Sequence, residues 1–440
     1  MAAERWDALI LGGGVAGLSC ATALAGAGRR VLVLEKSPCL GGRARTVRDS
    51  ETGAAWDNGP HLFAGRCHHL GRFLGRLGRA ELLSFPARLR MDFLDGRTAD
   101  SLKIPATLGS RFGLLWAVWS LRGLRASDKW GTLRLRRALA APDPAGLAAM
   151  TAAAWFESLG QSRQVQERLL DPLTRVLLNE PGSRVSAGVV AQVLRELLLG
   201  GGDAMRLGWS TVSFDELYVE PARAFISARG GTVLLSTEVT RLLEDDGRVL
   251  GAADVWGQRF LADAVVSTLP PWELKRLELP QRLRGSWEGL EASASAAVHI
   301  DLEGRVLDVP VAALSGATAS WLLARDGAGG RGQRLSVVVS AGRDVLQASD
   351  AAFFDAAKRD LSRCLPDFEK ARITGWKVVK EPEARLAQPP GTEERRPRPG
   401  QVLPGLSLAG DWTGTGLPAT IESAAAGGER AAEELMQSHA

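Results

Sequence analysis

The chain has 440 residues, of which 45% are hydrophobic and 24% are charged, and its formal net charge is +4. This length accommodates two or three domains with a sizeable core, and the composition excludes a largely disordered chain. No apolar run approaches the ~20 residues that span a bilayer, and the four cysteines form no C-x-x-C pair, so a reducing, cytoplasmic setting is expected.

The first 35 residues predict a strand–helix–strand unit. WDALIL (6–11) is a short apolar strand rather than the core of a signal peptide. Residues 15–28 are small and suit a tightly packed helix, and VLVLE (31–35) is a second buried strand. Three such elements within about 30 residues are typical of a βαβ unit.

A glycine motif marks the turn of this unit. Gly12, Gly14 and Gly17 provide a tight turn, close backbone approach to a pyrophosphate and close helix–strand packing, respectively. The phosphates of a dinucleotide would lie at the positive end of the helix. Glu35 ends the second strand and can accept hydrogen bonds from an adenosine ribose. A carboxylate there favours FAD or NAD over NADP.

Positive charge is concentrated in residues 103–140, which hold eight Lys or Arg and one acid. The same segment contains the apolar stretch FGLLWAVWSL and the tryptophans Trp116, Trp119 and Trp130. Two interpretations remain open: an interfacial helix pair on an anionic membrane surface, or a buried helix followed by a solvated basic one. No nucleic-acid-binding module accompanies the charge, so no nucleic-acid partner is predicted.

The middle of the chain alternates between helical and strand-like patterns. Residues 145–200 read mainly as helices, and residues 232–267 contain several short strands. Residues 295–380 predict further strands with one helix near 350–364. Residues 381–400 are rich in proline and charge and predict a surface connection.

Two other patterns invite a functional interpretation that we do not adopt. Gly327, Gly329 and Gly332 also match G-x-G-x-x-G, but a strand-like run follows them, which predicts a hairpin loop. Cys67 and the two histidines after it are consecutive and lack the spacing of metal ligands, so no metal site is predicted.

The C-terminal stretch LSLAGDWTGTGLPATIE (406–422) has the features of a ligand-binding loop. Its apolar run stops at Gly410 and Asp411, small residues and a proline follow, and a helix-like tail begins. The helix N-terminus suits the negative charge of a reduced cofactor.

Residues 35–43, E-x5-G-G-R after a dinucleotide-binding turn, resemble the flavin amine oxidase and phytoene desaturase superfamily. Within it the chain resembles the hydroxysqualene dehydroxylases over nearly its whole length. The matching segments are DNGPHLFAG (57–65), LLNEP (177–181), FDELYVEPARAFISARGG (214–231), LSVVVSAGRD (335–344) and AGDWTGTGLPATIESA (409–424). Pro60 and Glu180 depart from the family pattern, which usually has Gln and Thr there, and Pro60 is similar to the carotene desaturases.

The resemblance implies an α/β fold with a Rossmann-like FAD-binding domain and an inserted mixed-sheet and helical substrate domain. The FAD-binding domain is discontinuous and is expected to comprise residues 1–85, 205–270 and 396–440. Residues 86–204 and 271–395 form the expected substrate domain, in which residues 103–140 are a possible membrane-facing helical segment.

In this superfamily the two chain ends meet at the flavin. The resemblance places Arg43 along the pyrophosphate, Gly59, Pro60 and His61 beside the isoalloxazine, and Asp411 in a hydrogen bond to the cofactor. The full set of implied FAD contacts is Gly12, Gly14, Ala16, Gly17, Glu35, Lys36, Gly42, Arg43, Gly59, Pro60, His61, Val239, Gly410, Asp411, Thr420 and Ile421.

The implied activity is reductive removal of the hydroxyl group of hydroxysqualene, giving squalene in hopanoid or triterpene biosynthesis. Hydroxide is a poor leaving group, so a proton donor is needed, for which His61 is the first candidate and Glu180 the second. No cysteine follows Cys364, so FAD is expected to bind non-covalently. With one credible dinucleotide fingerprint, the electron donor is expected to be external.

Two alternatives remain open. One is oxidative chemistry, as in a carotenoid-type desaturase or an amine oxidase. The other is a non-catalytic prenyl-binding protein of the GDP-dissociation-inhibitor type, which the intact glycine motif, Glu35 and Asp411 disfavour. An isoprenoid substrate together with a basic, tryptophan-rich segment predicts a cytoplasmic protein peripheral to the inner face of the cell membrane.

Overall fold

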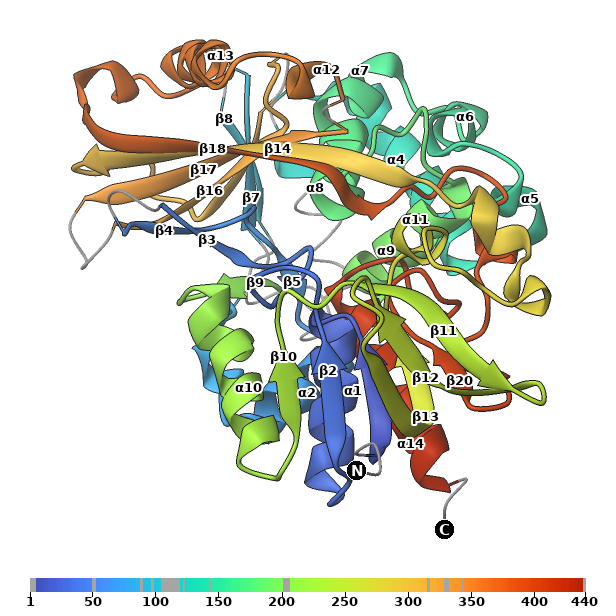
Figure 1. Cartoon of the computed structure of the whole chain (residues 1–440). Helices are drawn as coiled ribbons and strands as arrows, with labels where there is room; N and C mark the ends of the chain where they lie inside the picture. Colours follow the sequence, from blue (N-terminus) through green and yellow to red (C-terminus); the bar gives the residue numbers. More distant parts are fainter. Residues whose placement is uncertain are drawn as a thin grey trace.

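Two sheets with separate helical layers organise the chain (Figure 1). The computed structural model describes residues 5–49, 53–87, 90–95, 99–103, 119–121, 123–141, 144–200, 206–314, 317–327, 332–341 and 343–437.

The first sheet has eight strands in the order β10-β2-β1-β13-β12-β11, with β20 paired to the second half of β13 and β19 paired to β20. Strands β10, β2, β1, β13 and β20 run parallel, and every residue of β2 is buried, as expected of a strand covered on both faces. The bounds are β1 (Arg5–Leu11), β2 (Val31–Leu34), β10 (Thr232–Leu234), β11 (Val239–Asp245), β12 (Arg248–Asp254), β13 (Arg259–Ser267), β19 (Gly400–Leu403) and β20 (Leu406–Leu408).

Helix α14 (Ile421–Gln437) packs directly against α1 (Val15–Gly26), so the last segment of the chain lies beside the first (Figure 1). Contact is close because Gly428 has no side chain: a Cβ there would lie 2.2 Å from the carbonyl oxygen of Ala16. Helices α2 (His68–Arg76) and α10 (Glu220–Ser227) pack beside them. The predicted strand–helix–strand unit and the predicted final helix are confirmed.

The second sheet has seven strands in the order β18-β14-β17-β16-β15-β7-β8, antiparallel except for the pair β15–β7. Its bounds are β7 (Arg90–Leu94), β8 (Ala99–Lys103), β14 (Ala292–Glu303), β15 (Val311–Leu314), β16 (Trp321–Asp326), β17 (Gln333–Ser340) and β18 (Arg372–Leu386). Two small sheets join the layers: β3 (Thr46–Arg48) with β4 (Ala55–Asp57), and β9 (Leu207–Ser210) between β5 (Phe63–Ala64) and β6 (Leu83–Ser84).

Helices cover both faces of the second sheet. Helix α13 (Asp350–Cys364) buries Phe353, Ala357 and Leu361 against one face. A helical group shares a hydrophobic core with the other face: α4 (Ala126–Ala140), α5 (Pro144–Ala148), α6 (Ala152–Ser158), α7 (Arg163–Val165), α8 (Asp171–Leu178) and α9 (Ala187–Leu199). The helices predicted in residues 145–200 and near 350–364 are confirmed, whereas the domain limits stay predictions.

The second glycine motif stands between two paired strands, and its residues 328–331 lie outside the described residues. Strands β16 and β17 pair antiparallel, with Asp326 opposite Gln333, so residues 327–332 connect adjacent strands. No helix follows this loop to present an N-terminus to a phosphate.

The prediction of a surface connection over residues 381–400 is wrong in part. Strand β18 continues to Leu386, and Gln388, Thr392 and Arg396 are buried. The segment is tied into the protein by long-range side-chain contacts, which composition does not reveal.

Part of the predicted membrane-facing segment, residues 104–118, lies outside the described residues. Helix α4 buries Leu135 and Leu139, while Trp119 and Trp130 are 41% and 61% exposed. Their rings meet edge to face with centroids 5.3 Å apart. In the described part of the chain, no helix has the length and apolar character needed to cross a membrane.

Candidate functional site

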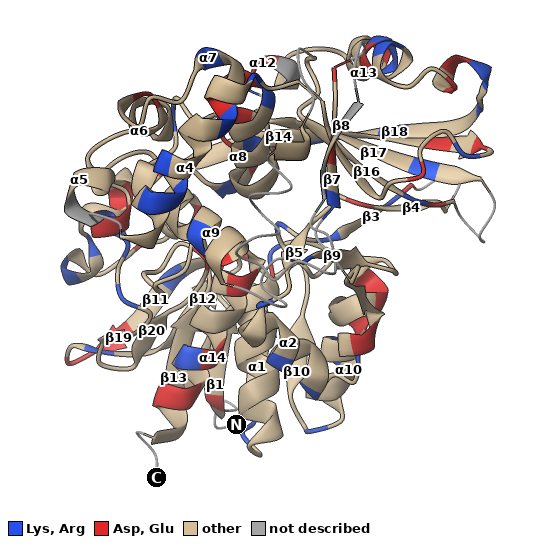
Figure 2. Ribbon diagram, turned by 180° about the vertical axis from the view of Figure 1, so that it is seen from behind, with Lys and Arg blue, Asp and Glu red and all other residues tan. Residues whose placement is uncertain are grey.

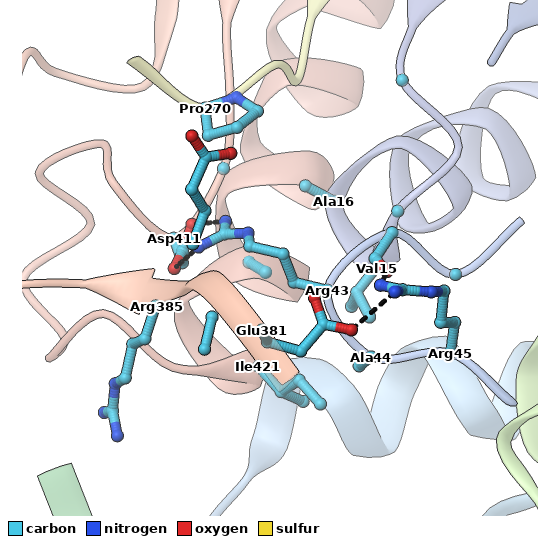
Figure 3. A pocket seen from close by; sticks show the side chains of 18 of the residues that line it. Val15, Ala16, Arg43, Ala44, Arg45, Pro270, Glu381, Arg385, Asp411 and Ile421 are labelled. Carbon is cyan, nitrogen blue, oxygen red and sulfur yellow. Dashed lines mark hydrogen bonds and ion pairs between the residues drawn. The ribbon is translucent and has the colours of Figure 1, made fainter. Parts of the chain in front are cut away.

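A cavity of about 510 Å³ lies at the carboxyl ends of β1 and β2, between the two sheets. Such strand ends are the usual place for ligands in α/β folds. Its wall comes from both ends of the chain and from β18 (Figure 3). The C-terminal end of α8 also contributes. The predicted cofactor contacts in the wall are Gly12, Gly14, Ala16, Glu35, Lys36, Gly42, Arg43, Gly59, Pro60, His61, Val239, Gly410, Asp411, Thr420 and Ile421.

The three motif glycines differ in their surroundings. Gly12 has φ +103°, which favours glycine, and a Cβ would lie 2.8 Å from Thr268 Oγ1. Gly14 is the N-cap of α1 without a side-chain cap, and a Cβ there would meet nothing closer than 3.9 Å. Gly17 is absent from the cavity wall: its Cβ would lie 1.9 Å from the Gly12 carbonyl oxygen, so it serves close packing of helix and strand.

The carboxylate of Glu35 is held at the end of β2 by two backbone groups. Its Oε2 accepts a hydrogen bond from Gly13 N at 2.7 Å, and its Oε1 accepts one from Ser37 N at 2.9 Å. Next to it, Lys36 Nζ donates to Glu273 Oε2 at 2.6 Å. This acid, the open Gly14 and the N-terminus of α1 fit the ribose and diphosphate of a dinucleotide.

Arg43 and Asp411 join the two chain ends across the cavity. The guanidinium forms a bidentate ion pair with the carboxylate (Figure 3). It also lies over the ring of Trp272, 5.3 Å from its centroid. A second pair, Arg45 with Glu381, links the N-terminal segment to β18. Sequence reasoning identified Arg43 and Asp411 but missed Trp272, Arg45 and Glu381.

His61 lies in the inner wall, where its ring packs on Phe214 with centroids 5.0 Å apart. Burial, reinforced by the positive charges of Arg385 and Arg325, lowers the pKa of His61 to about 4. Neither ring nitrogen has a hydrogen-bond partner among the described residues. The imidazole is therefore neutral near pH 7, which favours a hydrogen-bond donor over the protonated acid expected from the sequence.

Glu180 does not line the cavity, contrary to what a direct catalytic role would require. It follows Asn179, which ends α8 in the left-handed conformation (φ 57°). Its side chain is buried, and neither carboxylate oxygen has a hydrogen-bond partner in the described structure. Arg184 Nε is 3.9 Å from Oε2.

Arg385 is a wall residue that the sequence did not single out. From β18 it donates to the carbonyl oxygens of Ala419 (Nε, 2.7 Å) and Leu177 (Nη1, 3.0 Å). Burial lowers its pKa to about 10, and the nearby carboxylates of Asp411 and Glu180 oppose that shift. The guanidinium therefore stays charged at neutral pH and ties the C-terminal loop to α8.

Arg396 forms hydrogen bonds to the backbone of the loop that carries Asp411, and it is a second residue that the sequence did not single out. Arg396 Nη2 donates to the carbonyl oxygens of Asp411 (2.8 Å) and Thr413 (2.7 Å), and Nη1 donates to that of Leu417 (2.9 Å). Its side chain is fully buried. Composition gave no signal for this role, because Arg396 stands in a run of charged residues and prolines.

The chain is similar in sequence to known enzymes over nearly its whole length. The chain is 29% identical to a hydroxysqualene dehydroxylase of Sinorhizobium fredii, covering 96% of this chain and 97% of the relative. It is 31% identical to a hydroxysqualene dehydroxylase of Rhodopseudomonas palustris, covering 97% of each chain. A 15-cis-phytoene desaturase of Synechococcus elongatus is 25% identical over 97% of this chain and 95% of its own length.

The fold is similar to that of solved structures. An oxidoreductase from Methanosarcina mazei superimposes with a TM-score of 0.75 at 16% identity, covering 97% of this chain and 99% of the other. The family model for flavin-containing amine oxidoreductases matches residues 15–436, which include most of the cavity wall described above. The chain therefore belongs to the family of flavin-containing amine oxidoreductases and is a flavin-dependent oxidoreductase.

Proposed function

We propose that this chain is an FAD-dependent hydroxysqualene dehydroxylase that converts hydroxysqualene to squalene in hopanoid or triterpene biosynthesis. The main support for this proposal is the similarity of the chain to hydroxysqualene dehydroxylases, at up to 31% identity over nearly the whole length of this chain and of each relative. An inner cavity wall rich in apolar side chains supports an isoprenoid substrate, and includes Pro60, Leu62, Leu177, Trp321 and Val338.

FAD is the proposed cofactor, bound non-covalently. The N-terminus of α1 and Gly14 would bind its diphosphate, and Glu35 would bind its adenosine ribose. Arg43 would lie along the diphosphate, and Asp411 would form a hydrogen bond to the cofactor. When bound, the flavin supplies the hydride that replaces the hydroxyl group. The α14 N-terminus at Thr420 and Ile421 would stabilise negative charge at its pyrimidine end.

The proton for the departing hydroxyl needs a donor that the protein holds in place. The pKa of His61, lowered to about 4, argues that its neutral ring orients the substrate oxygen through an N–H group. Glu180 is buried near Arg385 but outside the wall, so a direct role would require it to move. Both remain candidates for mutation, with His61 the nearer to the proposed substrate.

An oxidative desaturase is the second candidate. It is favoured by 25% identity to a phytoene desaturase of similar length and by Pro60, which departs from the dehydroxylase pattern. An amine oxidase has less support, because the structural similarity at 16% identity concerns the fold alone. A purely prenyl-binding role would not account for the open Gly14 at the N-terminus of α1.

Two partners complete the proposal. An external electron donor is inferred because strand β17, and not a helix, follows the second glycine motif, so the described residues there present no helix N-terminus to a second dinucleotide. Anionic lipid at the inner face of the cell membrane is inferred from the exposed Trp130 on the basic helix α4 and from Trp119, whose ring packs against it.

An anaerobic single turnover tests the reaction. The bound flavin is photoreduced, hydroxysqualene is added, and flavin reoxidation is followed in the visible band while squalene is quantified. Reoxidation with stoichiometric squalene is expected. If the flavin stays reduced with hydroxysqualene but the oxidised enzyme is reduced by phytoene, the dehydroxylase assignment fails and the desaturase takes its place.

A further inference from the structure

We propose that Asn179 and Ser295 form a polar subsite in the cavity wall that binds the hydroxyl group of an alcohol-bearing isoprenoid. This inference rests on the proposed function and names the residues that distinguish the alcohol from the corresponding hydrocarbon. Both residues belong to the wall, and both are half-buried. They come from different elements, because Asn179 ends α8 and Ser295 lies on β14.

The side chain of Ser295 lies on the face of the second sheet that packs against the helical group. Ala297 stands in one row with Val338 on β17 and Trp321 on β16, and all three belong to the core shared with those helices. Residues two apart on a strand share a face, so Ser295 points the same way as Ala297. Because β14 is paired on both edges at this position, with β17 and β18, the exposed part of Ser295 faces the cavity that it lines.

A hydrogen bond to β14 holds the amide of Asn179 beside Ser295. Asn179 takes the left-handed conformation (φ 57°) at the end of α8, and its Nδ2 donates to the carbonyl oxygen of Ala294 at 3.1 Å. The regular pairing of β14 with β18 is interrupted at Ala294, where residues 382–384 of β18 stand opposite it. Such irregularities are frequent next to binding sites, where they redirect side chains.

One oxygen atom on each of the two side chains is available to a ligand. Oδ1 of Asn179 and Oγ of Ser295 form no hydrogen bond with any described residue. Neither atom is enclosed by the protein, because the enclosed and unpartnered polar atoms of the described residues include neither of them. Since both residues line the cavity, these two oxygens are accessible from it.

The two oxygens match the hydrogen-bonding groups of an alcohol. The amide oxygen accepts a hydrogen bond from the alcohol O–H group, and the serine hydroxyl donates one to the alcohol oxygen. That oxygen can accept a second hydrogen bond, so the contact proposed for His61 is compatible with this one. A hydrocarbon makes neither contact and displaces water from both groups, which is unfavourable. Nearby apolar wall residues suit the rest of an isoprenoid: Leu177, Trp321 and Val338.

The test compares hydroxysqualene with squalene, two ligands that differ at the hydroxyl group. Their dissociation constants are measured on the flavin-loaded protein from the perturbation of the oxidised flavin spectrum. The wild type is expected to prefer the alcohol by about tenfold, because two neutral hydrogen bonds are lost without the hydroxyl group. Ser295→Ala is expected to reduce this preference to about threefold or less while leaving squalene binding unchanged.

Further variants separate the subsite from general effects on the strand. Ser293→Ala makes the same change two residues away on β14, at a buried side chain outside the wall, and is expected to keep the tenfold preference. Asn179→Gly removes the amide but tolerates the left-handed conformation, and is expected to reduce the preference as Ser295→Ala does. The double variant Asn179→Gly/Ser295→Ala is expected to bind the two ligands with equal affinity.

An unchanged preference in flavin-loaded Ser295→Ala, or an equal loss in Ser293→Ala, overturns the subsite. A wild type that binds both ligands equally and still releases squalene in the single turnover overturns it as well. Failure of the wild type to release squalene overturns the proposed function instead. If Asn179→Gly does not hold flavin, the comparison of Ser295→Ala with Ser293→Ala decides the question alone.

Discussion

Gly14 and Gly17 belong to one motif, but different surroundings restrict the side chain at each position. A side chain on Gly17 would collide with the Gly12 carbonyl oxygen, 1.9 Å from its Cβ, whereas the nearest atoms to a Cβ on Gly14 are 3.9 Å away. Gly14 also has φ −80°, which any residue adopts. The constraint on Gly17 is therefore internal packing, and the constraint on Gly14 comes from what binds beside it.

These two positions give a prediction with an internal control. Gly17→Ala is expected to destabilise the protein by about 1–3 kcal/mol through overpacking, with loss of flavin as a consequence. Gly14→Ala is expected to change the free energy of unfolding by less than about 1 kcal/mol yet to weaken flavin binding markedly. Urea unfolding and the ratio of visible to ultraviolet absorbance measure both effects. Equal destabilisation by the two substitutions would contradict this division of roles.

Among the structural elements, those with a local pattern were predictable and those held by distant contacts were not. The strand at 6–11 and the helix after it follow from short runs of apolar and of small residues, and these elements and α13 were located from the sequence. Strand β18 was missed after residue 380, because prolines and charges indicate a connection and the buried hydrogen bonds of Arg385 and Arg396 are invisible locally. In the site, the glycine motif and Asp411 belong to recognisable sequence motifs, whereas Arg385 and Arg396 do not.

The C-terminal loop depends on one buried arginine, which makes the element testable. Arg396→Met would leave the carbonyl oxygens of Asp411, Thr413 and Leu417 without their shared donor. We expect a loss of about 3 kcal/mol in the free energy of unfolding and a shorter residence time of the flavin. The neighbouring Arg395 is exposed, so Arg395→Met should change stability by less than about 0.5 kcal/mol. A stable Arg396→Met variant that retains flavin would show that the loop holds its shape unaided.

At the scale of the whole molecule, ion pairs span the seam between the two sheets. Arg45 with Glu381, Arg325 with Asp57 and Lys377 with Asp49 each connect an N-terminal segment to the second sheet. The cavity lies along this seam, so both sheets contribute residues to its wall. The proposed isoprenoid substrate would have to reach that site from a phase in which it dissolves, so the outer surface bears on the proposed function.

Helix α4 carries several basic residues (Figure 2), and it also carries the exposed Trp130. We expect the protein to sediment with phosphatidylglycerol vesicles more than with phosphatidylcholine vesicles, because each Lys or Arg near an anionic surface contributes about 1 kcal/mol. The binding should fall at high salt.

The double variant Trp119→Ser/Trp130→Ser is expected to lose most of this binding. Trp256, which is 86% exposed on the turn between β12 and β13, provides the control: Trp256→Ser should bind as the wild type does. Similar losses in both variants would indicate general surface hydrophobicity rather than a docking face. No sedimentation of the wild type with either vesicle would leave α4 as an ordinary solvated helix, and the substrate would then need a carrier to reach the cavity.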